Sequence, residues 1–285
     1  MTKRIFLVLL AAVFTAQAWA EPVEYPTNKD GSTITGVLTA GFDPLDTEGN
    51  GPVFPFPFNL FFLDLSTLSI SDFTLNIPVD DPNDFSDPAV ALSAIDGFST
   101  TEKWTVRFLD GAARGRPPGQ IDPASVVPGQ SVRFFEVTTT SVLVVTGIVS
   151  EMVPGVDYVT AVADGGVLAI IPLKPLKEMT SYMAVLTNDI KDTQGNDATP
   201  DRTYYLTQFE EPWYQNGQST YALIPDDLAF TLSQIQPIVH SWEAAAESAG
   251  VVRDDIILSW VAQTQSITPV LKHLRSIAKP AATDF

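Results

Sequence analysis

The sequence predicts a mainly β protein, a β-sandwich built from short strands and followed by a C-terminal helix–strand–helix segment. Short apolar runs rich in β-branched and aromatic residues recur between residues 132 and 186, separated by turn residues. A turn of the form D-x-x-G-N follows at residues 192–196, where Asp and Asn can bond their own backbone and Gly195 permits positive φ. After Pro225 the apolar spacing changes to that of an amphipathic helix.

Residues 1–20 carry the pattern of a secretory signal peptide. Lys3 and Arg4 precede an apolar stretch at residues 5–14, which is too short for a permanent membrane span, and Ala18-Trp19-Ala20 fits the cleavage motif. We favour this interpretation over a buried N-terminal helix. It predicts cleavage after Ala20 and a secreted, periplasmic or cell-surface protein.

Composition excludes several classes of function. The chain has no cysteine, so it has no disulfides, no thiol nucleophile, no zinc–thiolate site and no acylation site of a lipoprotein. Its formal net charge of -18 disfavours nucleic acid and charge-driven binding to anionic membranes. With 45% hydrophobic residues it can bury one or two cores. No cofactor motif is present, and we expect no cofactor.

The polar N-terminal stretch at residues 21–51 ends in an acidic loop. Asp43, Asp46, Glu48 and Asn50 offer oxygen ligands of the kind that calcium prefers. Their spacing does not fit the D-x-[DN]-x-[DN]-G loop of calcium-binding EF-hands. We favour a solvated acidic loop and keep calcium as the alternative.

Residues 52–65 are densely aromatic and contain three prolines. Proline cannot donate to a sheet ladder, so this run is expected to be extended or to lie at a sheet edge. Such a run can touch lipid when exposed. We favour the alternative, in which it wraps the domain and buries its phenylalanines.

The remaining elements of the β region follow from apolar runs and turn residues. Short strands are expected at residues 74–78, 106–109, 132–137, 142–149, 158–163, 167–171 and 181–186. Helical turns are expected at residues 88–95 and 122–129, with an acidic loop at 80–87 and a Gly/Pro/Arg loop at 111–119. Whether this region forms one domain or two stays open.

A long helix is expected after Pro225. Asp226 and Asp227 supply an N-cap and negative charge at its start, and Gly250 is a natural stop. Pro237 must kink or divide the helix. Apolar residues at spacings of four and three share one face: Leu228, Leu232, Ile235, Val239 and Trp242.

A strand and a second helix complete the chain. The strand at residues 253–264 carries Ile256, Leu258 and Trp260 on one face. The amphipathic helix at residues 267–278 carries Val270, Leu271, Leu274 and Ile277. Two helices around one strand cannot bury their apolar faces alone, so they must pack on the β region or on chain beyond residue 285.

Residues with catalytic potential are few. His240 and His273 lie alone in the two predicted helices, and we interpret both as surface or helix-face residues. Ser99, Ser131 and Ser219 each follow a G-x-S start but lack the second glycine of the G-x-S-x-G elbow of hydrolases. None lies between a strand and a helix. We therefore predict no catalytic, cofactor-binding or metal site, although chance pairs among 34 acids leave glycoside-hydrolase chemistry open.

Residues 168–196 resemble the immunoglobulin-like modules of bacterial surface and secreted proteins. In those modules L-x-x-P-x-x-P-L leads into a T-x-Y-x-V-x-L strand and an I-x-D-x-x-G-N turn; here the stretch reads LAIIPLKPLKEMTSYMAVLTNDIKDTQGN. The resemblance implies an Ig-like β-sandwich module at about residues 125–210.

A second resemblance covers most of the chain, from about Phe42 to the C-terminal helix. Its motifs are PFPFNLFF at 55–62, TLNIP at 74–78, ALSAIDGFSTT at 91–101 and RFFEV at 133–137, together with residues 168–196. They are similar to the N-terminal domain of bacterial virulence-factor lipases, which are secreted or surface lipases and lysophospholipases of Gram-negative bacteria. The resemblance implies a longer polypeptide, in which an α/β-hydrolase domain follows.

These interpretations divide the chain into a signal peptide at 1–20, a β-rich lipase N-terminal domain at 21–224 and a helix–strand–helix segment at 225–285. The expected function is a non-catalytic region that supports or positions a downstream lipase domain. That domain is the expected partner, with a lipid or membrane surface as a second one. The alternative is a stand-alone extracellular Ig-like binding or adhesion module.

Overall fold

The computed structural model describes residues 27–44, 53–63, 70, 73–75, 79, 81–93, 95–111 and 115–278. The predicted signal peptide and most of the acidic loop at 43–51 lie outside the described residues. Three of the five residues of the strand expected at 74–78 also lie outside them.

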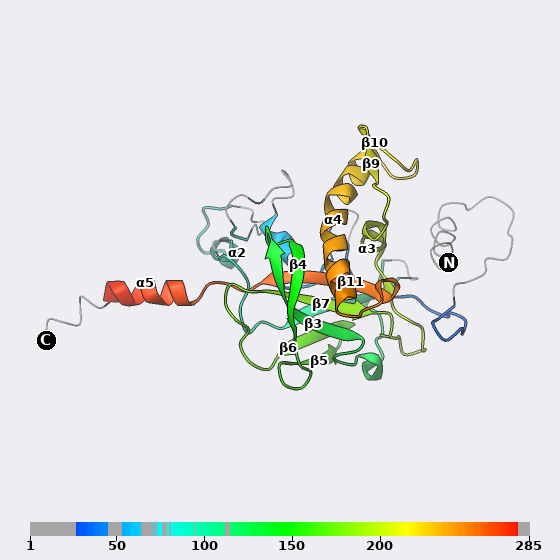
Figure 1. The fold of residues 1–285 in the computed structure, drawn as a ribbon, viewed down its shortest axis with the longest axis horizontal. Coiled ribbons are helices and arrows are strands. Elements are labelled where there is room, and N and C mark those ends of the chain that lie inside the picture. Colours follow the sequence, from blue (N-terminus) through cyan, green and yellow to red (C-terminus); the bar gives the residue numbers. More distant parts are fainter. Residues whose placement is uncertain are drawn as a thin grey trace.

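The described strands form two main sheets and a small hairpin (Figure 1). The first sheet has the order β5-β6-β2-β1-β8 and comprises β5 (Tyr158–Ala163), β6 (Val167–Pro172), β2 (Trp104–Asp110), β1 (Leu38–Ala40) and β8 (Thr199–Pro200). The second has the order β11-β7-β3-β4 and comprises β11 (Ile256–Gln263), β7 (Ser181–Thr187), β3 (Val132–Thr140) and β4 (Val144–Glu151). The hairpin pairs β9 (Tyr214–Gln215) with β10 (Gln218–Ser219).

Aromatic side chains join the two sheets face to face. The ring of Trp104 on β2 lies 5.0 Å from that of Phe134 on β3 and 5.9 Å from that of Trp260 on β11. Tyr158 on β5 lies 5.6 Å from Phe134, and its hydroxyl donates to the carbonyl oxygen of Val132 at 3.0 Å. The predicted mainly β fold with a sandwich core is therefore confirmed. Its Ig-like character stays a prediction.

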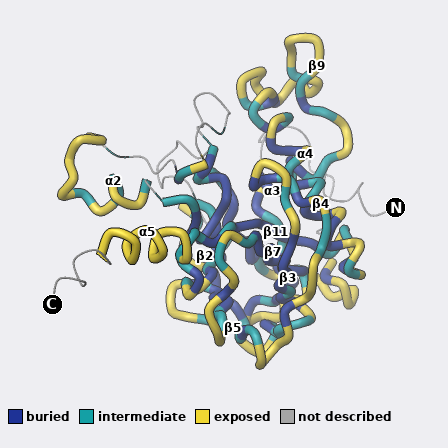
Figure 2. The backbone as a smooth tube through the Cα atoms, turned by 60° about the vertical axis from the view of Figure 1, so that its left-hand side comes forward, coloured by how far each residue is buried: buried dark blue, intermediate teal, exposed yellow. Residues whose placement is uncertain are grey.

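The second sheet is covered on both faces. Every residue of β7 is buried, and so is every residue of β11 except Gln263 (Figure 2). One face meets the first sheet, and α4 (Asp226–Ser248) crosses the other beside β4 and β11. Coverage of both faces explains why these strands read as continuous apolar runs rather than alternating ones.

Helix α4 runs unbroken through Pro237, so this proline does not divide the helix, and the other expected outcome, a kink, stays a prediction. The predicted N-cap is also wrong: Pro225 holds the cap position, and Asp226 instead accepts the backbone N–H of Ser219 in the hairpin at 2.7 Å. The predicted stop is confirmed. Gly250 has φ +84°, and the N–H of Val251 donates back to the carbonyl of Ala246, as in a Schellman motif.

The aromatic–proline run wraps the sandwich, as expected, but it does not bury all its phenylalanines, since Phe56 is 43% exposed. Phe56 pairs with Thr105 of β2 through two backbone hydrogen bonds, and the 3-10 helix η2 (Asn59–Phe62) follows. Phe58 and Phe62 are buried, and Phe58 packs 6.0 Å from the ring of Trp242 on α4. The run therefore joins the first sheet to α4.

The D-x-x-G-N turn ties the N-terminal segment to the sandwich. The carboxylate of Asp192 accepts the backbone N–H and the side-chain amide of Asn196, at 2.8 and 2.6 Å. The Oδ1 atom of Asn196 in turn accepts the N–H of Thr35 at 2.7 Å. Gly195 has φ +90°, as the predicted turn requires.

Other elements follow the expected positions. The strands at 106–109, 132–137, 142–149, 158–163, 167–171 and 181–186 are confirmed as β2 to β7, and the helical turns as α2 (Pro88–Leu92) and η3 (Pro123–Ser125). Thr74 and Leu75 form no strand.

The strand expected at residues 253–264 begins later than predicted, because residues 253–255 form the 3-10 helix η4 (Arg253–Asp255). A register shift between Ile256 and Leu258 also means that Ile256 does not share one face of the strand with Leu258 and Trp260, as was predicted.

One buried apolar cluster reaches from Leu38 to Ala262, and it includes Trp242 of α4 and Trp260 of β11. A small second cluster, with Leu206, Trp213 and Leu232, lies between α3 (Arg202–Thr207), the hairpin and α4. The predicted domain boundary between residues 224 and 225 stays a prediction, and β11 pairs with β7 across it.

Candidate functional site

Helix α5 (Thr268–Ala278) projects from the sandwich and buries none of its residues (Figures 1 and 2). Its apolar residues share one face, and each is more than half exposed: Val270 53%, Leu271 58%, Leu274 56% and Ile277 61%. The amphipathic helix expected at residues 267–278 is thus confirmed. Its apolar stripe packs on no described part of the β region.

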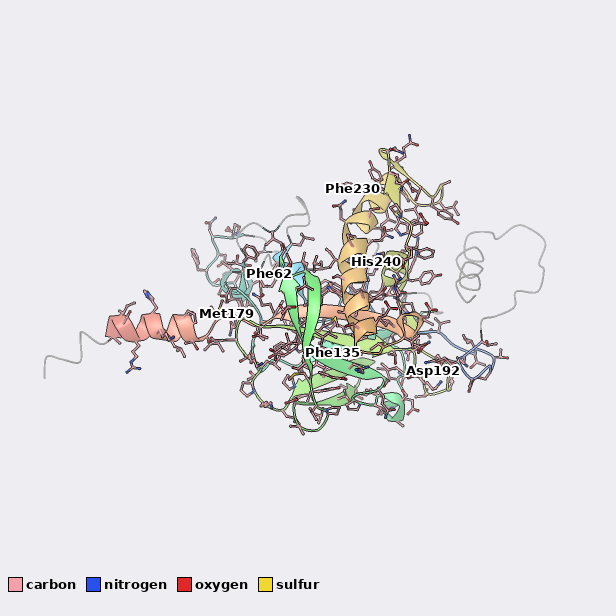
Figure 3. All side chains as sticks on the ribbon, viewed as in Figure 1. Phe62, Phe135, Met179, Asp192, Phe230 and His240 are labelled. Atoms are coloured by element: carbon pink, nitrogen blue, oxygen red, sulfur yellow. The ribbon has the colours of Figure 1, made fainter. Side chains whose placement is uncertain are left out.

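The start of α5 is fixed by a carboxylate from another part of the chain. The Oε2 atom of Glu178, in the connection between β6 and β7, accepts the backbone N–H groups of Ile267 at 2.7 Å and Thr268 at 2.5 Å. Met179 beside it is 61% exposed and lies at the base of the helix (Figure 3). Hydrogen bonds from Thr268, and then from Ile267, lower the pKa of Glu178 below its ordinary value.

The polar face of α5 is basic. It carries Lys272, His273 and Arg275, and the helix contains no acid, in a chain whose net charge is -18. A short helix with one apolar stripe and a cationic flank is suited to an apolar groove bordered by carboxylates.

A pocket of about 320 Å³ lies between η2, the turn from β3 to β4, and the N-terminal half of α4. Leu60, Leu143 and Ile235 form buried parts of its wall. Gln234 and Ser141 lie at its exposed rim. Thr231, Gln234, Ile235 and Ile238 are spaced so that one face of α4 forms this side.

The turn that forms one wall of the pocket is strained. Ser141 and Val142 both have φ +54°, a conformation that residues other than glycine rarely adopt, β-branched Val142 least of all, and that costs about 1–3 kcal/mol for each residue. Two buried side chains hold it: Asn59 donates to the carbonyl of Val142 at 2.5 Å, and Trp242 Nε1 donates to that of Leu143 at 2.7 Å. The turn is therefore fixed from both η2 and α4.

A buried polar network links α3, α4 and β11. Glu243 is fully buried and accepts hydrogen bonds from Arg253 at 2.8 Å and Gln208 at 2.7 Å. The hydroxyls of Tyr204 and Ser259 lie 2.7 Å apart, and both residues are fully buried. Burial, and next the charge of Glu243, raise the pKa of Tyr204 well above its ordinary value, so the phenol stays protonated. Glu243, Tyr204 and Ser259 have no solvent access, so these three residues position elements rather than meet a substrate.

The serines singled out from the sequence serve local backbone geometry. Ser99 accepts the N–H of Thr101 at 3.2 Å, buried Ser131 bonds the backbone of Ser125 and Val127, and Ser219 donates to the carbonyl of Tyr221. Within the described residues, neither histidine side chain is hydrogen bonded to a serine. His240 lies on α4 (Figure 3), and its Nε2 atom is buried and has no hydrogen-bond partner among the residues that the structure describes. His273 lies on exposed α5.

Asp43 and Asp201 lie close together beside Arg116. The guanidinium pairs with the buried carboxylate of Asp201, and Thr203 donates to Asp43 at 2.9 Å. Burial raises the pKa of Asp201, and the hydrogen bond and charge of Arg116 oppose that shift. In the described part of the chain, no three His, Asp or Glu side chains gather into a metal-binding group. The calcium alternative falls mostly outside the described residues and stays untested.

Sequence reasoning missed the two residues that position these surfaces. Glu178 appeared only as part of a polar connection, and Asn59 only as part of an aromatic run. Their partners, Thr268 and Val142, lie 90 and 83 residues away along the chain, and no local pattern indicates such a pairing.

Three comparisons with known proteins bear on this site. A family model described as "Bacterial virulence factor lipase N-terminal" matches residues 66–282, a range that includes α5. Among curated proteins none matches. The chain is also similar to one solved structure, "Structure of surface layer protein SbsC, domains 1-6", with 14% sequence identity and a TM-score of 0.21. The match covers 39% of this chain and 13% of that chain, and a TM-score this low says nothing about the fold. Within the described residues, no helix is long and apolar enough to cross a membrane.

Proposed function

The chain belongs to the bacterial virulence factor lipase N-terminal family, and from this premise we propose that it is a non-catalytic region that positions a downstream lipase domain. The partner is an α/β-hydrolase domain of the same polypeptide, which carries the G-x-S-x-G serine. The lipase is secreted, after cleavage of the signal peptide behind Ala20.

The observation that carries this proposal is the apolar stripe of α5. Four apolar side chains of α5 are more than half exposed, because the sandwich does not cover this helix. The family match includes α5, so the helix is part of the family's pattern. Burying a leucine side chain is worth about 1.5–3 kcal/mol, so a helix that exposes two of them favours a covering partner. The sandwich supplies the rigid base, and Glu178 sets where α5 begins.

Two observations test whether catalysis lies in a downstream domain rather than in this chain. The reading frame that continues beyond residue 285 is expected to encode a hydrolase domain with G-x-S-x-G. A purified protein of residues 21–285 is expected to show no turnover of short-chain p-nitrophenyl esters. Robust turnover that Ser99→Ala abolishes would place the chemistry in this chain and overturn the proposal.

The alternative function is a stand-alone extracellular module of Ig-like type that binds or adheres. The two-sheet sandwich with the D-x-x-G-N turn supports it, since such modules need no enzyme attached. A reading frame that stops after residue 285, in a protein that remains a monomer, would favour this alternative.

A further inference from the structure

We propose that the pocket between η2, the β3–β4 turn and α4 binds one aliphatic chain of a single-chain amphiphile whose head group is zwitterionic or uncharged. The proposal names a ligand class for the lipase region and rests on the proposed function for the source of that ligand. Binding itself depends only on this chain.

The lining of the pocket selects an aliphatic ligand. No charged side chain among the described residues lines it, although charged residues make up 18% of the sequence. Its buried wall is formed by Leu60, Leu143 and Ile235, and the polar groups at the rim are neutral. Burying an ionic group there without a partner would be costly, whereas a hydrocarbon chain needs none. The volume of about 320 Å³ lies at the small end of known ligand sites, which suits one chain rather than two.

The surroundings of the rim select the head group. Helix α4, which forms one side, contains no lysine or arginine and begins with Asp226 and Asp227. An amphiphile with a carboxylate or phosphate-monoester head would meet this negative charge, and no described residue that lines the pocket supplies a compensating cation. A phosphocholine or glycerol head instead leaves the hydroxyl and amide groups of Thr231 and Gln234 as neutral neighbours.

The opposite wall is held in place independently of any ligand. Ser141 and Val142 have left-handed backbone conformations, and with the turn in this conformation Ser141 and Leu143 line the pocket. Asn59 and Trp242, both fully buried, hold the turn by its carbonyl groups. Backbone strain that the surrounding structure maintains is typical of functional sites, and here it borders the pocket.

Binding is measured on the protein of residues 21–285 with alkylphosphocholines of increasing chain length, each below its micelle concentration, by displacement of fluorescent N-phenylnaphthylamine. Because these probes contain no carboxylic ester, the result does not depend on a hydrolase domain. Affinity is expected to rise about fourfold with each added methylene and then to stop rising once the pocket is full. Alkyl carboxylates of equal length are expected to bind more weakly.

Variants locate the binding. Gln234→Trp places a large side chain at the exposed rim and is expected to weaken binding about tenfold or more, while Ala244→Trp, on the exposed part of α4 away from the pocket, leaves it unchanged. Leu63→Ala enlarges the pocket and shifts the plateau to a longer chain. Three results would each overturn the proposal: no displacement by any chain length, affinity that rises without a plateau, or equal binding by Gln234→Trp. The last two would place the probe on another apolar surface such as α5.

Discussion

One carboxylate oxygen of Glu178 accepts the backbone N–H of Thr268 at 2.5 Å, and this contact joins the β6–β7 connection to the first turn of α5. The same oxygen accepts the N–H of Ile267. A carboxylate at a helix N-terminus satisfies donors that the helix itself leaves unpaired and favours the positive end of its dipole. The direction in which α5 leaves the sandwich therefore depends on a residue that precedes it by 90 positions.

The Glu178 contact is expected to be lost in acid. Because hydrogen bonds from Thr268 and Ile267 lower the pKa of Glu178, the contact is present above the ordinary value of 4.5 and is lost as the pH falls through the lower pKa of the folded state. The amide NMR signals of Ile267 and Thr268 should titrate with a midpoint below 4.5, and Glu178→Gln should abolish that titration. A midpoint at or above 4.5 would contradict this explanation.

Asn59→Ala is expected to destabilise the fold by about 3 kcal/mol in urea unfolding, because it leaves two polar groups unpaired. The side chain is fully buried; it donates to the carbonyl of Val142 and accepts the N–H of Gln263 at 2.7 Å. Asn83→Ala, in an exposed loop, serves as the matched control and should change stability by less than about 0.5 kcal/mol. Equal effects of the two substitutions would mean that Asn59 does not hold the turn.

Arg253→Met is expected to destabilise the protein by about 3 kcal/mol, since it leaves the fully buried carboxylate of Glu243 without its cation. Removing both charges, in Glu243→Leu with Arg253→Met, should recover most of that loss because no unpaired buried charge remains. Thermal and urea unfolding of both variants measure the difference. If the double variant is as unstable as the sum of the two single variants, the two residues do not act as a pair.

Local patterns predicted most of the fold. The spacing of apolar residues and the positions of turn residues located β2 to β7, α4 and α5. These features depend only on residues that are close together in the sequence. Predictions failed where a distant partner decided the outcome. Helix α4 continues past Pro237 while Trp242 and Ser241 bond the β3–β4 turn and β4, and the bulge in β11 depends on its pairing with β7.

The sequence predicted one of the two candidate surfaces, the apolar stripe of α5, but not the pocket. The apolar stripe of α5 follows directly from the spacing of Val270, Leu271, Leu274 and Ile277, but the sequence left open what covers it. The pocket could not be predicted, since its walls come from η2, the β3–β4 turn and α4. Only the fold brings these segments together, and no motif accompanies them.

Hydrogen–deuterium exchange of residues 268–278 tests the central claim most directly. In this chain alone the amides of α5 should exchange fast, because a helix of 11 residues without a packing partner is marginally stable in water. In the longer lipase polypeptide the same amides should be protected, and Leu271→Glu with Leu274→Glu should remove that protection while leaving the exchange of β7 unchanged. Equally fast exchange of α5 in both proteins would show that no downstream domain covers this helix.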